Sequence, residues 1–372
     1  MRVTQPAVLV GPYDWDETLI PKSEFEARIK DVWSQLRGQG LAGLLVYGSK
    51  VDNAALAYLT NFTPKIADAW ALLSPDGAVR LHSSGSPHMM VNAQRLTWVD
   101  GVKPIRDIGK HIADWAEALA PGPLGLWATP TMGGDIPPRI AAANPTRPIK
   151  DVNATLDPLL LPKSPVARRV MRDASGILAS ATAALREAFK SGATARAAIV
   201  AAEKAAADAG ASDVRVLASL SAGGTPTAID YPQSGKLDPL LAYIAVRYGG
   251  YWAEGALTLA SSPSDTLKKT EAALHAMLAK ARAGATVAEL KAAAQEKLGG
   301  FAPHPVAKKP LSGIGLSLEE SEAEPGGVTR LEEGRIYTLR AGARGSASDN
   351  ALLSAMIEPK ADRAEVLWSA LA

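Results

Sequence analysis

Two glycine-containing segments near the C-terminus constrain the fold of this chain more than any other feature of its sequence. The first, Leu311 to Glu320, reads Leu-Ser-Gly-Ile-Gly-Leu-Ser-Leu-Glu-Glu. The second, Leu331 to Gly342, carries Gly334, an alternating run over Arg335 to Leu339, and then Arg340. Glycine permits tight turns and close backbone approach, and alternation of apolar and polar residues indicates a strand. We therefore expect each segment to make a glycine turn followed by a strand, and the two together to form one wall of a site.

The composition excludes several classes of function. The 372 residues include 40 Lys and Arg against 38 Asp and Glu, which leaves a formal net charge of +2 without a basic stripe. Nucleic acid and membrane surfaces are therefore not expected partners. Cysteine is absent, which excludes disulfides, zinc ribbons and thiolate nucleophiles. No apolar run approaches the roughly 20 residues of a membrane span, and the N-terminus lacks a signal-peptide core, so we expect a cytoplasmic protein of two domains.

The N-terminal half alternates predicted helices and strands, which is the pattern of a small α/β layer domain. Ser23 and Glu26 have the spacing of a capping box at the start of an amphipathic helix. The elements expected after it are a strand over Leu41–Tyr47, a short helix between Asp52 and Phe62, a hairpin of Trp70–Leu73 with Val79–His82, a helix over Ile108–Leu119 and a strand over Leu124–Trp127. Prolines at 158, 162 and 165 cluster near residue 160, where we expect the boundary between domains 1–160 and 161–372.

The C-terminal half predicts helices gathered against a strand-rich sheet, which makes the chain as a whole α+β. Ser164 followed by Pro165 is a strong helix start, because the serine hydroxyl accepts a free backbone N–H and proline needs none at the first position. The elements expected after this helix are a second helix over about Thr194–Ala209, two strands within Leu240–Leu259, a helix over about Ser264–Ala283, and a helix capped by Thr286 with Glu289.

Several of these motifs together resemble the creatinase, prolidase and aminopeptidase P family. In the N-terminal half they are Gly40-Leu-Ala-Gly-Leu-Leu-Val-Tyr47 and Asn53-Ala-Ala-Leu-Ala-Tyr-Leu-Thr-Asn-Phe62. In the C-terminal half they are Tyr248-Gly-Gly-Tyr251, Gly313-Ile-Gly-Leu316 and the strand between Gly334 and Gly342. The resemblance covers nearly the whole chain. It implies a creatinase-type α/β N-terminal domain, a pita-bread catalytic-type domain after it, and a homodimer.

The resemblance also implies a two-metal site, built in the family from two Asp, one His and two Glu, since hard cations require several anionic oxygens. The positions that correspond to these five ligands are Tyr243, Glu254, Ser312, Arg340 and Ser348. One carboxylate among five positions does not hold two metals, and a guanidinium that stays protonated stands where a metal would lie. We therefore expect no metal and no other cofactor.

Creatinase itself works without metal through a histidine, and that route is altered here as well. By the resemblance, Asp230 stands at the position of the creatinase histidine. Glu319 stands at the position of a second histidine that is common in the family, and the glutamate that follows it in the family is present as Glu320. The candidate catalytic residues are therefore Glu254, Glu319 and Glu320, as acid/base candidates. The candidate substrate-binding residues are Asp230, Tyr243, Tyr248, Ser312 and Arg340. Two interpretations of Arg340 stay open, a bidentate clamp on a substrate carboxylate or a salt bridge to Glu254 or Glu319 that fills a vacated metal site.

Three functions follow from this pattern. The first is a metal-independent, creatinase-like hydrolase of a C–N bond in a small nitrogen-containing metabolite. The second is a catalytically inactive pseudoenzyme that keeps the fold to bind a metabolite, peptide or protein. The third, a metal-dependent Xaa-Pro aminopeptidase or dipeptidase, is disfavoured by the substituted ligands. In each case the expected partner is a small molecule or a short peptide.

Overall fold

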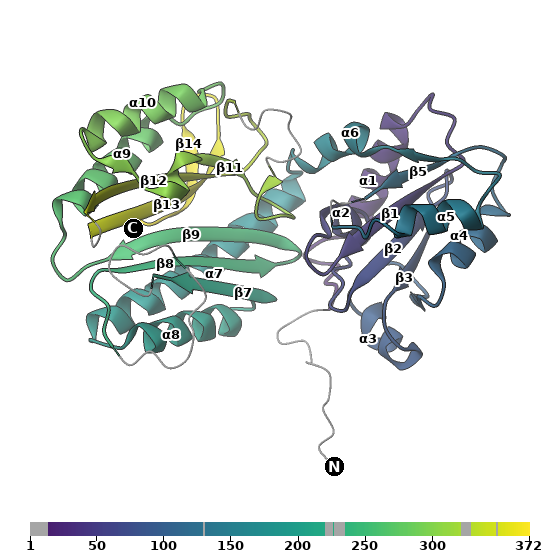
Figure 1. Ribbon diagram of the computed structural model, residues 1–372, viewed down its shortest axis with the longest axis horizontal. Helices are drawn as coiled ribbons and strands as arrows, with labels where there is room; N and C mark the ends of the chain where they lie inside the picture. Colours follow the sequence, from purple (N-terminus) through teal and green to yellow (C-terminus); the bar gives the residue numbers. More distant parts are fainter. Residues whose placement is uncertain (1–13, 129–130, 220–225, 227–234, 321–328, 347–348) are drawn as a thin grey trace, which may run out of the picture. The chain divides into compact units, whose positions relative to one another are not determined.

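The computed structural model describes residues 14–128, 131–219, 226, 235–320, 329–346 and 349–372. The chain divides into two compact units, Met1–Leu161 and Pro162–Ala372, and each is described by itself (Figure 1). No helix in the described ranges has both the length and the apolarity that a membrane crossing requires.

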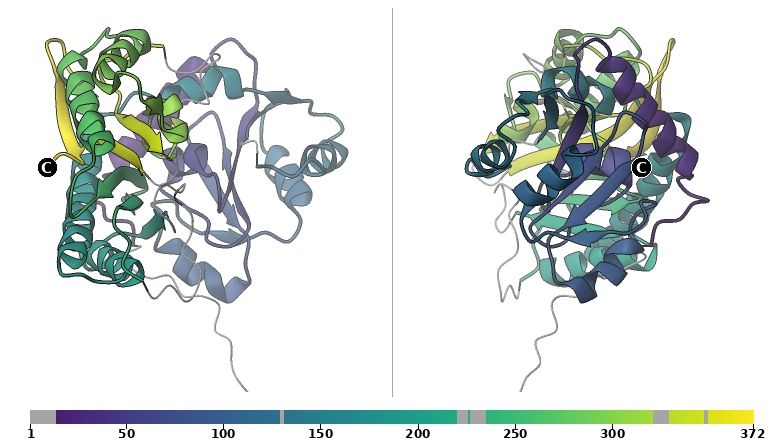
Figure 2. Two further views of the ribbon diagram at one scale, coloured as in Figure 1. Left: turned by 60° about the vertical axis from the view of Figure 1, so that its left-hand side comes forward. Right: turned by 90° about the vertical axis from the view of Figure 1, so that its right-hand side faces the viewer.

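The first unit is a mixed sheet with helices on both faces (Figure 2). Its strands follow the order β4-β3-β2-β1-β5-β6; β1 is antiparallel to β2 and parallel to β5. The elements are α1 (Lys22–Gln35), β1 (Gly43–Ser49), α2 (Ala54–Thr60), β2 (Asp68–Leu73), β3 (Val79–Ser83), η1 (Pro87–Met89), α3 (Met90–Gln94), β4 (Lys103–Pro104), α4 (Ile108–Ala116), β5 (Leu124–Trp127), α5 (Ile136–Ala143), β6 (Ile149–Asp151), α6 (Asn153–Leu156) and η2 (Asp157–Leu160).

Strand β1 shows why this sheet is buried on both sides. Leu44 and Val46 belong to an apolar cluster shared with α1 and α2, whereas Leu45 and Tyr47 belong to a second cluster shared with α4 and α5. Successive side chains of a strand point to opposite faces, so a strand covered on both faces is a continuous apolar run. Leu41–Tyr47 has this pattern, and the predicted strand is confirmed with its bounds shifted by two residues.

The first helix begins differently from the prediction. It starts at Lys22 with Pro21 as its N-cap, and no side chain caps it, so the capping box of Ser23 with Glu26 is wrong. Pro21 has an extended backbone, with φ −68° and ψ 151°, and its missing N–H costs nothing just before a helix. The helix therefore begins before Ser23, which lies within its first turn.

Among its described residues, the second unit contains two sheets and four long helices. One sheet has the order β7-β8-β9, and the other has the order β10-β12-β13-β14 with β11 also paired to β12. The elements are α7 (Pro165–Lys190), α8 (Ala195–Asp208), β7 (Asp213–Ala218), β8 (Leu240–Tyr248), β9 (Tyr251–Leu259), α9 (Asp265–Lys280), α10 (Val287–Leu298), β10 (Ala302–Pro303), η3 (Pro305–Lys308), β11 (Leu311–Gly313), β12 (Tyr337–Ser346), β13 (Asp349–Pro359) and β14 (Ala364–Ser369).

The four helix starts predicted in this unit are confirmed. The hydroxyl groups of Ser164, Thr194 and Ser264 accept the backbone N–H three residues on, and Thr286 with Glu289 forms a complete capping box. Each cap satisfies an N–H that the first helical turn leaves unpaired.

Side chains join the two sheets where β9 meets β13. The backbone N–H of Ala256 donates to Ser354 Oγ over 2.7 Å, and Thr258 Oγ1 accepts from Leu352 N over 2.9 Å. Between these residues and Glu254, Gly255 leaves space for the ring of Trp368, which a Cβ atom would overlap. The sheets therefore meet closely enough for side chains of β9 to reach strands of the second sheet.

The segment Leu311–Glu320 departs from the predicted order of turn and strand. Strand β11 comes before the glycines and ends at Gly313, and Ile314–Glu320 forms no strand. Glu320 folds back on this segment, because its Oε1 accepts from Leu316 N over 3.1 Å. The second segment does form a strand, but β12 begins two residues later than expected and continues to Ser346.

Candidate functional site

The hairpin of β8 and β9 brings Tyr243 and Glu254 onto one face of their sheet. Gly249 and Gly250 have φ values of 53° and 83°, which a tight two-residue turn requires and glycine adopts without strain. The resulting register pairs Tyr243 with Ala256 and Ala245 with Glu254, so the two side chains are diagonal neighbours. Tyr243 Oη donates to Glu254 Oε2 over 2.5 Å.

Strands β11 and β12 supply the other half of the site. Ser312 pairs with Thr338, two residues before Arg340, so the three side chains face the same way. Arg340 Nη1 donates to Ser312 Oγ over 2.8 Å, and Nη2 donates to Glu254 Oε1 in a close ion pair. Tyr243, Glu254, Arg340 and Ser312 thus form one continuous hydrogen-bonded chain, which we call the substituted cluster.

Burial of the substituted cluster fixes the protonation of Tyr243. Glu254 is 2% exposed and Ser312 is fully buried. Burial, followed by the charge of the Glu254 carboxylate, raises the pKa of Tyr243 well above its ordinary value of 10. The phenol therefore stays protonated and acts as a donor, and both oxygens of Glu254 accept a hydrogen bond.

Apolar side chains of the same unit pack against the cluster. Leu241, Ala256 and Leu352 form a small buried group, and the rings and methyls of Tyr243 and Ala307 pack against it. Tyr243 therefore has two roles, since its ring fills an apolar contact while its hydroxyl holds Glu254.

The residues of the substituted cluster do not fit the two-metal site that the resemblance implied. They offer one carboxylate, a phenol, a hydroxyl and a cation, whereas divalent metals in such sites need several anionic oxygens. Across the described ranges, no group of three or more His, Cys, Asp or Glu is placed to hold a metal. The positive charge that a metal would supply is already provided by Arg340.

The fifth position, Ser348, lies outside the described residues, but β13 offers a residue that faces the cluster. Ser354 lies directly opposite Arg340 in the antiparallel register, and opposite residues face the same side of a sheet. Its hydroxyl is already used by Ala256 N. The register thus places Ser354, which no sequence motif indicated, on the same face as Arg340.

Glu319 and Glu320 are not part of the substituted cluster. Glu319 is 42% exposed at its side chain and pairs with Lys309 over 2.5 Å. Glu320 is buried and pairs with Lys163 Nζ over 2.6 Å, in addition to its bond from Leu316 N. Burial raises the pKa of Glu320 above its ordinary value of 4.5, and the Lys163 ammonium opposes this shift. Lys163 lies 157 residues away in sequence, and no motif indicated its role.

The remaining candidates lie apart from the cluster or outside the described residues. Tyr248 is at the end of β8, five residues from Tyr243, so it lies roughly 16 Å along the strand on the opposite face. Asp349, a further acidic residue near the predicted pocket, accepts from Ser264 and Thr266 at the start of α9 and anchors that helix. Asp230 falls outside the described residues.

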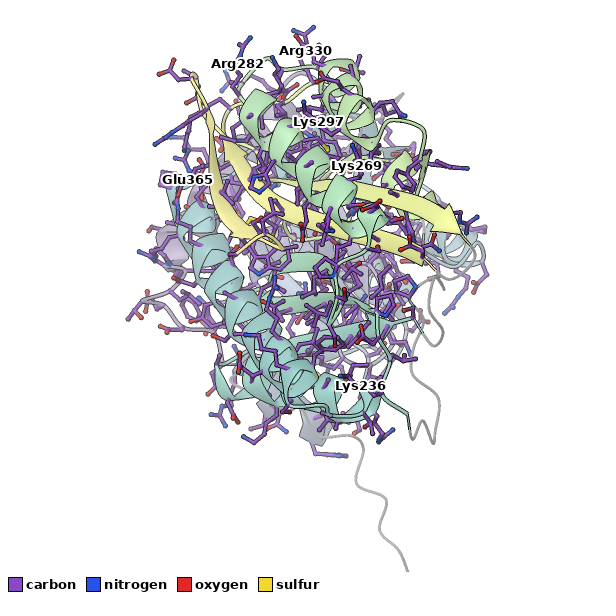
Figure 3. All side chains as sticks on the ribbon, turned by 90° about the vertical axis from the view of Figure 1, so that its left-hand side faces the viewer. Lys236, Lys269, Arg282, Lys297, Arg330 and Glu365 are labelled. Atoms are coloured by element: carbon purple, nitrogen blue, oxygen red, sulfur yellow. The ribbon has the colours of Figure 1, made fainter. Side chains whose placement is uncertain are left out.

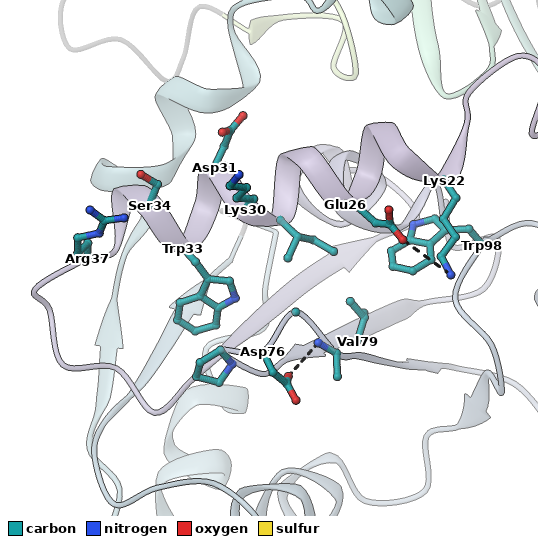
Figure 4. A pocket seen from close by; sticks show the side chains of 14 residues that line it. Lys22, Glu26, Lys30, Asp31, Trp33, Ser34, Arg37, Asp76, Val79 and Trp98 are labelled. Atoms are coloured by element: carbon teal, nitrogen blue, oxygen red, sulfur yellow. Dashed lines mark hydrogen bonds and ion pairs between the residues drawn. The ribbon is translucent and has the colours of Figure 1, made fainter.

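A large cavity in the first unit contains none of the predicted site residues. It has a volume of about 820 Å³ and lies between α1 and the turn that joins β2 to β3 (Figure 4). Trp33 and Trp98 contribute apolar walls, and Lys22 and Glu26 form an ion pair of 3.9 Å at its rim. Three basic and three acidic residues line it, so it has no preference for one sign of charge.

Comparisons with known proteins agree with this architecture. The model of metallopeptidase family M24 matches residues 169–357. No curated protein matches the sequence significantly. Among solved structures, the chain is similar to the prolidase from Pyrococcus horikoshii OT3, with a TM-score of 0.72 and 16% identity over 92% of this chain and 97% of that one.

Two further structures give the same result. The X-Pro aminopeptidase from Thermotoga maritima MSB8 has a TM-score of 0.71 and 18% identity, covering 91% of this chain and 97% of that one. The Xaa-Pro dipeptidase from Bacillus anthracis has a TM-score of 0.69 and 18% identity, covering 93% and 97%. Identities this low show the fold, which is the mixed α and β, pita-bread-type architecture expected from the sequence.

Proposed function

This chain belongs to metallopeptidase family M24, and we propose that within it the chain is a metal-free member that binds a ligand without hydrolysing it. One observation carries the proposal: both carboxylate oxygens of Glu254 are occupied, one by Tyr243 and the other by Arg340. A general base needs a free oxygen within reach of the proton that it abstracts. Each oxygen of Glu254 already accepts one of these bonds, and Arg340 holds the carboxylate as a buried, paired charge, which limits the access of a substrate proton to it.

The pairing also accounts for how the fold tolerates the loss of its metal ligands. An isolated buried carboxylate is expensive, and a cation with further hydrogen bonds compensates it. Arg340 supplies that cation, Ser312 accepts from the second guanidinium nitrogen, and Tyr243 satisfies the other carboxylate oxygen. The substituted cluster is therefore a structural replacement for bound metal, with no group left to activate water.

A second candidate, the metal-independent hydrolase of a C–N bond, is favoured by one feature of Arg340. Arginine has five N–H donors, and the contacts described above use two of them. Its side chain is 11% exposed. The remaining donors suit a substrate carboxylate, which would place Arg340 as an anchor and Glu254 beside it as the acid/base group.

The two candidates are separated by assaying metal content and turnover together. Purified protein is loaded with manganese or zinc, dialysed against chelator, and tested on Xaa-Pro dipeptides, guanidino compounds and small amides. We expect no retained metal and no turnover. Chelator-insensitive turnover that Glu254→Gln abolishes, and that the surface variant Glu319→Gln keeps, would establish the hydrolase. Turnover that requires manganese would overturn both proposals.

A further inference from the structure

A second cavity lies in the C-terminal unit, between α10, η3 and the Arg340–Gly342 part of β12. Its volume is about 470 Å³, within the range of sites that hold small molecules. It is lined by Lys291, Ala292, Ala294, Gln295, Leu298, Pro303, Ala307, Lys308, Pro310, Arg340, Ala341 and Gly342. We call this cavity the α10 groove.

The floor of the α10 groove is apolar. Ala294 and Leu298 lie one turn apart on α10 and are buried, and two further lining residues, Pro310 and Ala341, are also buried. Residues four positions apart on a helix lie on the same face, so the side chains of Ala294 and Leu298 face the groove together. A ligand that enters the groove therefore meets aliphatic carbon at its base.

The charges that line the α10 groove have one sign. Lys291 and Lys308 line it together with Arg340, and no Asp or Glu does. The guanidinium of Arg340 is committed to Glu254 and Ser312, whereas neither lysine forms an ion pair within the part of the chain that the structure describes. Two uncompensated ammonium groups thus flank an apolar floor.

Nearby carboxylates do not neutralise these lysines, because each has another partner. Glu296 pairs with Lys297 over 2.7 Å, and Glu319 pairs with Lys309 over 2.5 Å. Glu289 accepts from Thr286 as part of the capping box. The positive charge at the groove is therefore a local excess.

Two other cavities among the described residues lack this excess of positive charge. The cavity beside α1 is lined by Lys22, Lys30 and Arg37, but also by Glu26, Asp31 and Asp76. A cavity beside β14 mixes both signs in the same way, with Lys360 and Arg363 among three acidic residues. Neither has the charge pattern that selects an anion.

We propose that the α10 groove binds a small organic anion with one carboxylate and an apolar body. The carboxylate contacts Lys291 and Lys308, and the apolar body covers Ala294 and Leu298. Arg340 lines the groove and also belongs to the substituted cluster, but the proposed contacts are made by Lys291 and Lys308, so this inference stands whether or not that cluster is catalytic.

The test is a calorimetric titration of the full-length chain with phenylacetate, alongside neutral phenylacetamide, which has the same ring. A double variant of the groove lysines, Lys291→Gln with Lys308→Gln, is compared with a control double variant, Lys297→Gln with Lys309→Gln. The control pair comes from the same two segments and removes the same net charge, but its lysines are paired with glutamates and lie outside the groove lining. Lys297 can be located in Figure 3.

We expect saturable binding of phenylacetate to the unmodified chain. The affinity should be roughly 10-fold lower for phenylacetamide, and roughly 10-fold lower for phenylacetate in the groove double variant, since each change removes two partly exposed charge contacts. The control pair should bind as the unmodified chain does. Ala292→Trp, at an exposed position of the lining, should block both probes. Absence of binding, or equal weakening by the groove and control pairs, would overturn the proposal. This experiment measures binding and not turnover or metal content, so its failure is distinct from failure of the proposed function.

Discussion

Glu254 and Glu320 are two buried carboxylates of the same unit, each paired with a cation, and they differ in what surrounds the pair. Glu254 is held by side chains of β8 and β12, and the β12 residue, Arg340, is in turn held by Ser312 of β11. Glu320 is held by Lys163, just before α7, and by the backbone of its own loop. The first carboxylate joins two sheets, and the second fixes one turn against a helix start.

The difference shows that burial and pairing do not by themselves identify a functional carboxylate. Burial raises the pKa of Glu320, and a raised carboxyl pKa is often taken to indicate an active site. Its contacts with Lys163 and the backbone N–H of Leu316 nevertheless stabilise the local structure. Glu254 instead connects side chains of β8 and β12 across the two sheets, and it is this arrangement that makes it a candidate site residue.

The largest expected effect comes from removing the cation of the substituted cluster. Arg340→Met leaves Glu254 buried without its counter-charge, and we expect a loss of about 3–5 kcal/mol in the free energy of unfolding. Adding Glu254→Gln should recover part of that loss. Urea denaturation at neutral pH measures both. Lys204→Met, which breaks an exposed pair with Asp208 on α8, should cost less than about 1 kcal/mol. An equally small loss in Arg340→Met would mean that the buried ion pair is not formed.

Removing the cation beside Glu320 should cost about 3 kcal/mol at pH 7 and less in acid. In Lys163→Met the opposing ammonium is gone, so the pKa of Glu320 rises further. A carboxyl whose folded-state pKa is raised favours the folded state when protonated, so this loss is greatest above the folded pKa and shrinks as pH falls through it.

The comparison needs the unmodified chain at each pH. Burial lowers the pKa of His82 and His304 to about 4, so both chains lose stability as pH falls from the ordinary 6.5 toward 4. The difference between variant and unmodified chain isolates Glu320. A difference that stays constant from pH 7 to pH 5 would show that Glu320 takes up no proton.

A smaller effect is expected at Tyr243. Tyr243→Phe keeps the ring against Leu241 and Ala256 but removes the donor to Glu254, and a hydrogen bond to a charged group contributes about 1.5–3 kcal/mol. In a Glu254→Gln background the same change should cost clearly less. Equal costs in the two backgrounds, measured by a double-mutant cycle, would mean that the phenol does not act through Glu254.

The sequence predicted the local structure of this protein better than its site. Helix starts at Ser164, Thr194, Ser264 and Thr286 depend on contacts three residues apart, and these were confirmed. The capping box predicted at Ser23 was wrong, because Pro21 is also a suitable N-cap and comes earlier in the chain. Local patterns fail where two of them compete within a few residues.

The site depended on contacts that local patterns do not carry. The motifs placed Tyr243, Glu254, Ser312 and Arg340 at corresponding ligand positions, but they left Glu254 and Glu319 as equal partners for Arg340. The structure decides for Glu254, because β9 and β12 face each other while the loop after Gly313 turns Glu319 to the surface. Adjacent residues Glu319 and Glu320 thus have different surroundings, and the second is fixed by a lysine 157 residues away.

The smallest expected effect distinguishes two neighbouring hydroxyl groups of the site. Ser312→Ala removes the acceptor for Arg340 Nη1, and we expect a loss of about 1 kcal/mol, because Arg340 keeps its ion pair with Glu254. Thr338 lies directly opposite Ser312 and is also buried, but its hydroxyl has no partner among the described residues. Thr338→Val has nearly the same shape and removes an unsatisfied polar group, so it should leave stability unchanged or raise it. Urea denaturation of the two variants side by side tests this, and a loss in Thr338→Val as large as that in Ser312→Ala would show that the polar network extends beyond the four residues of the substituted cluster.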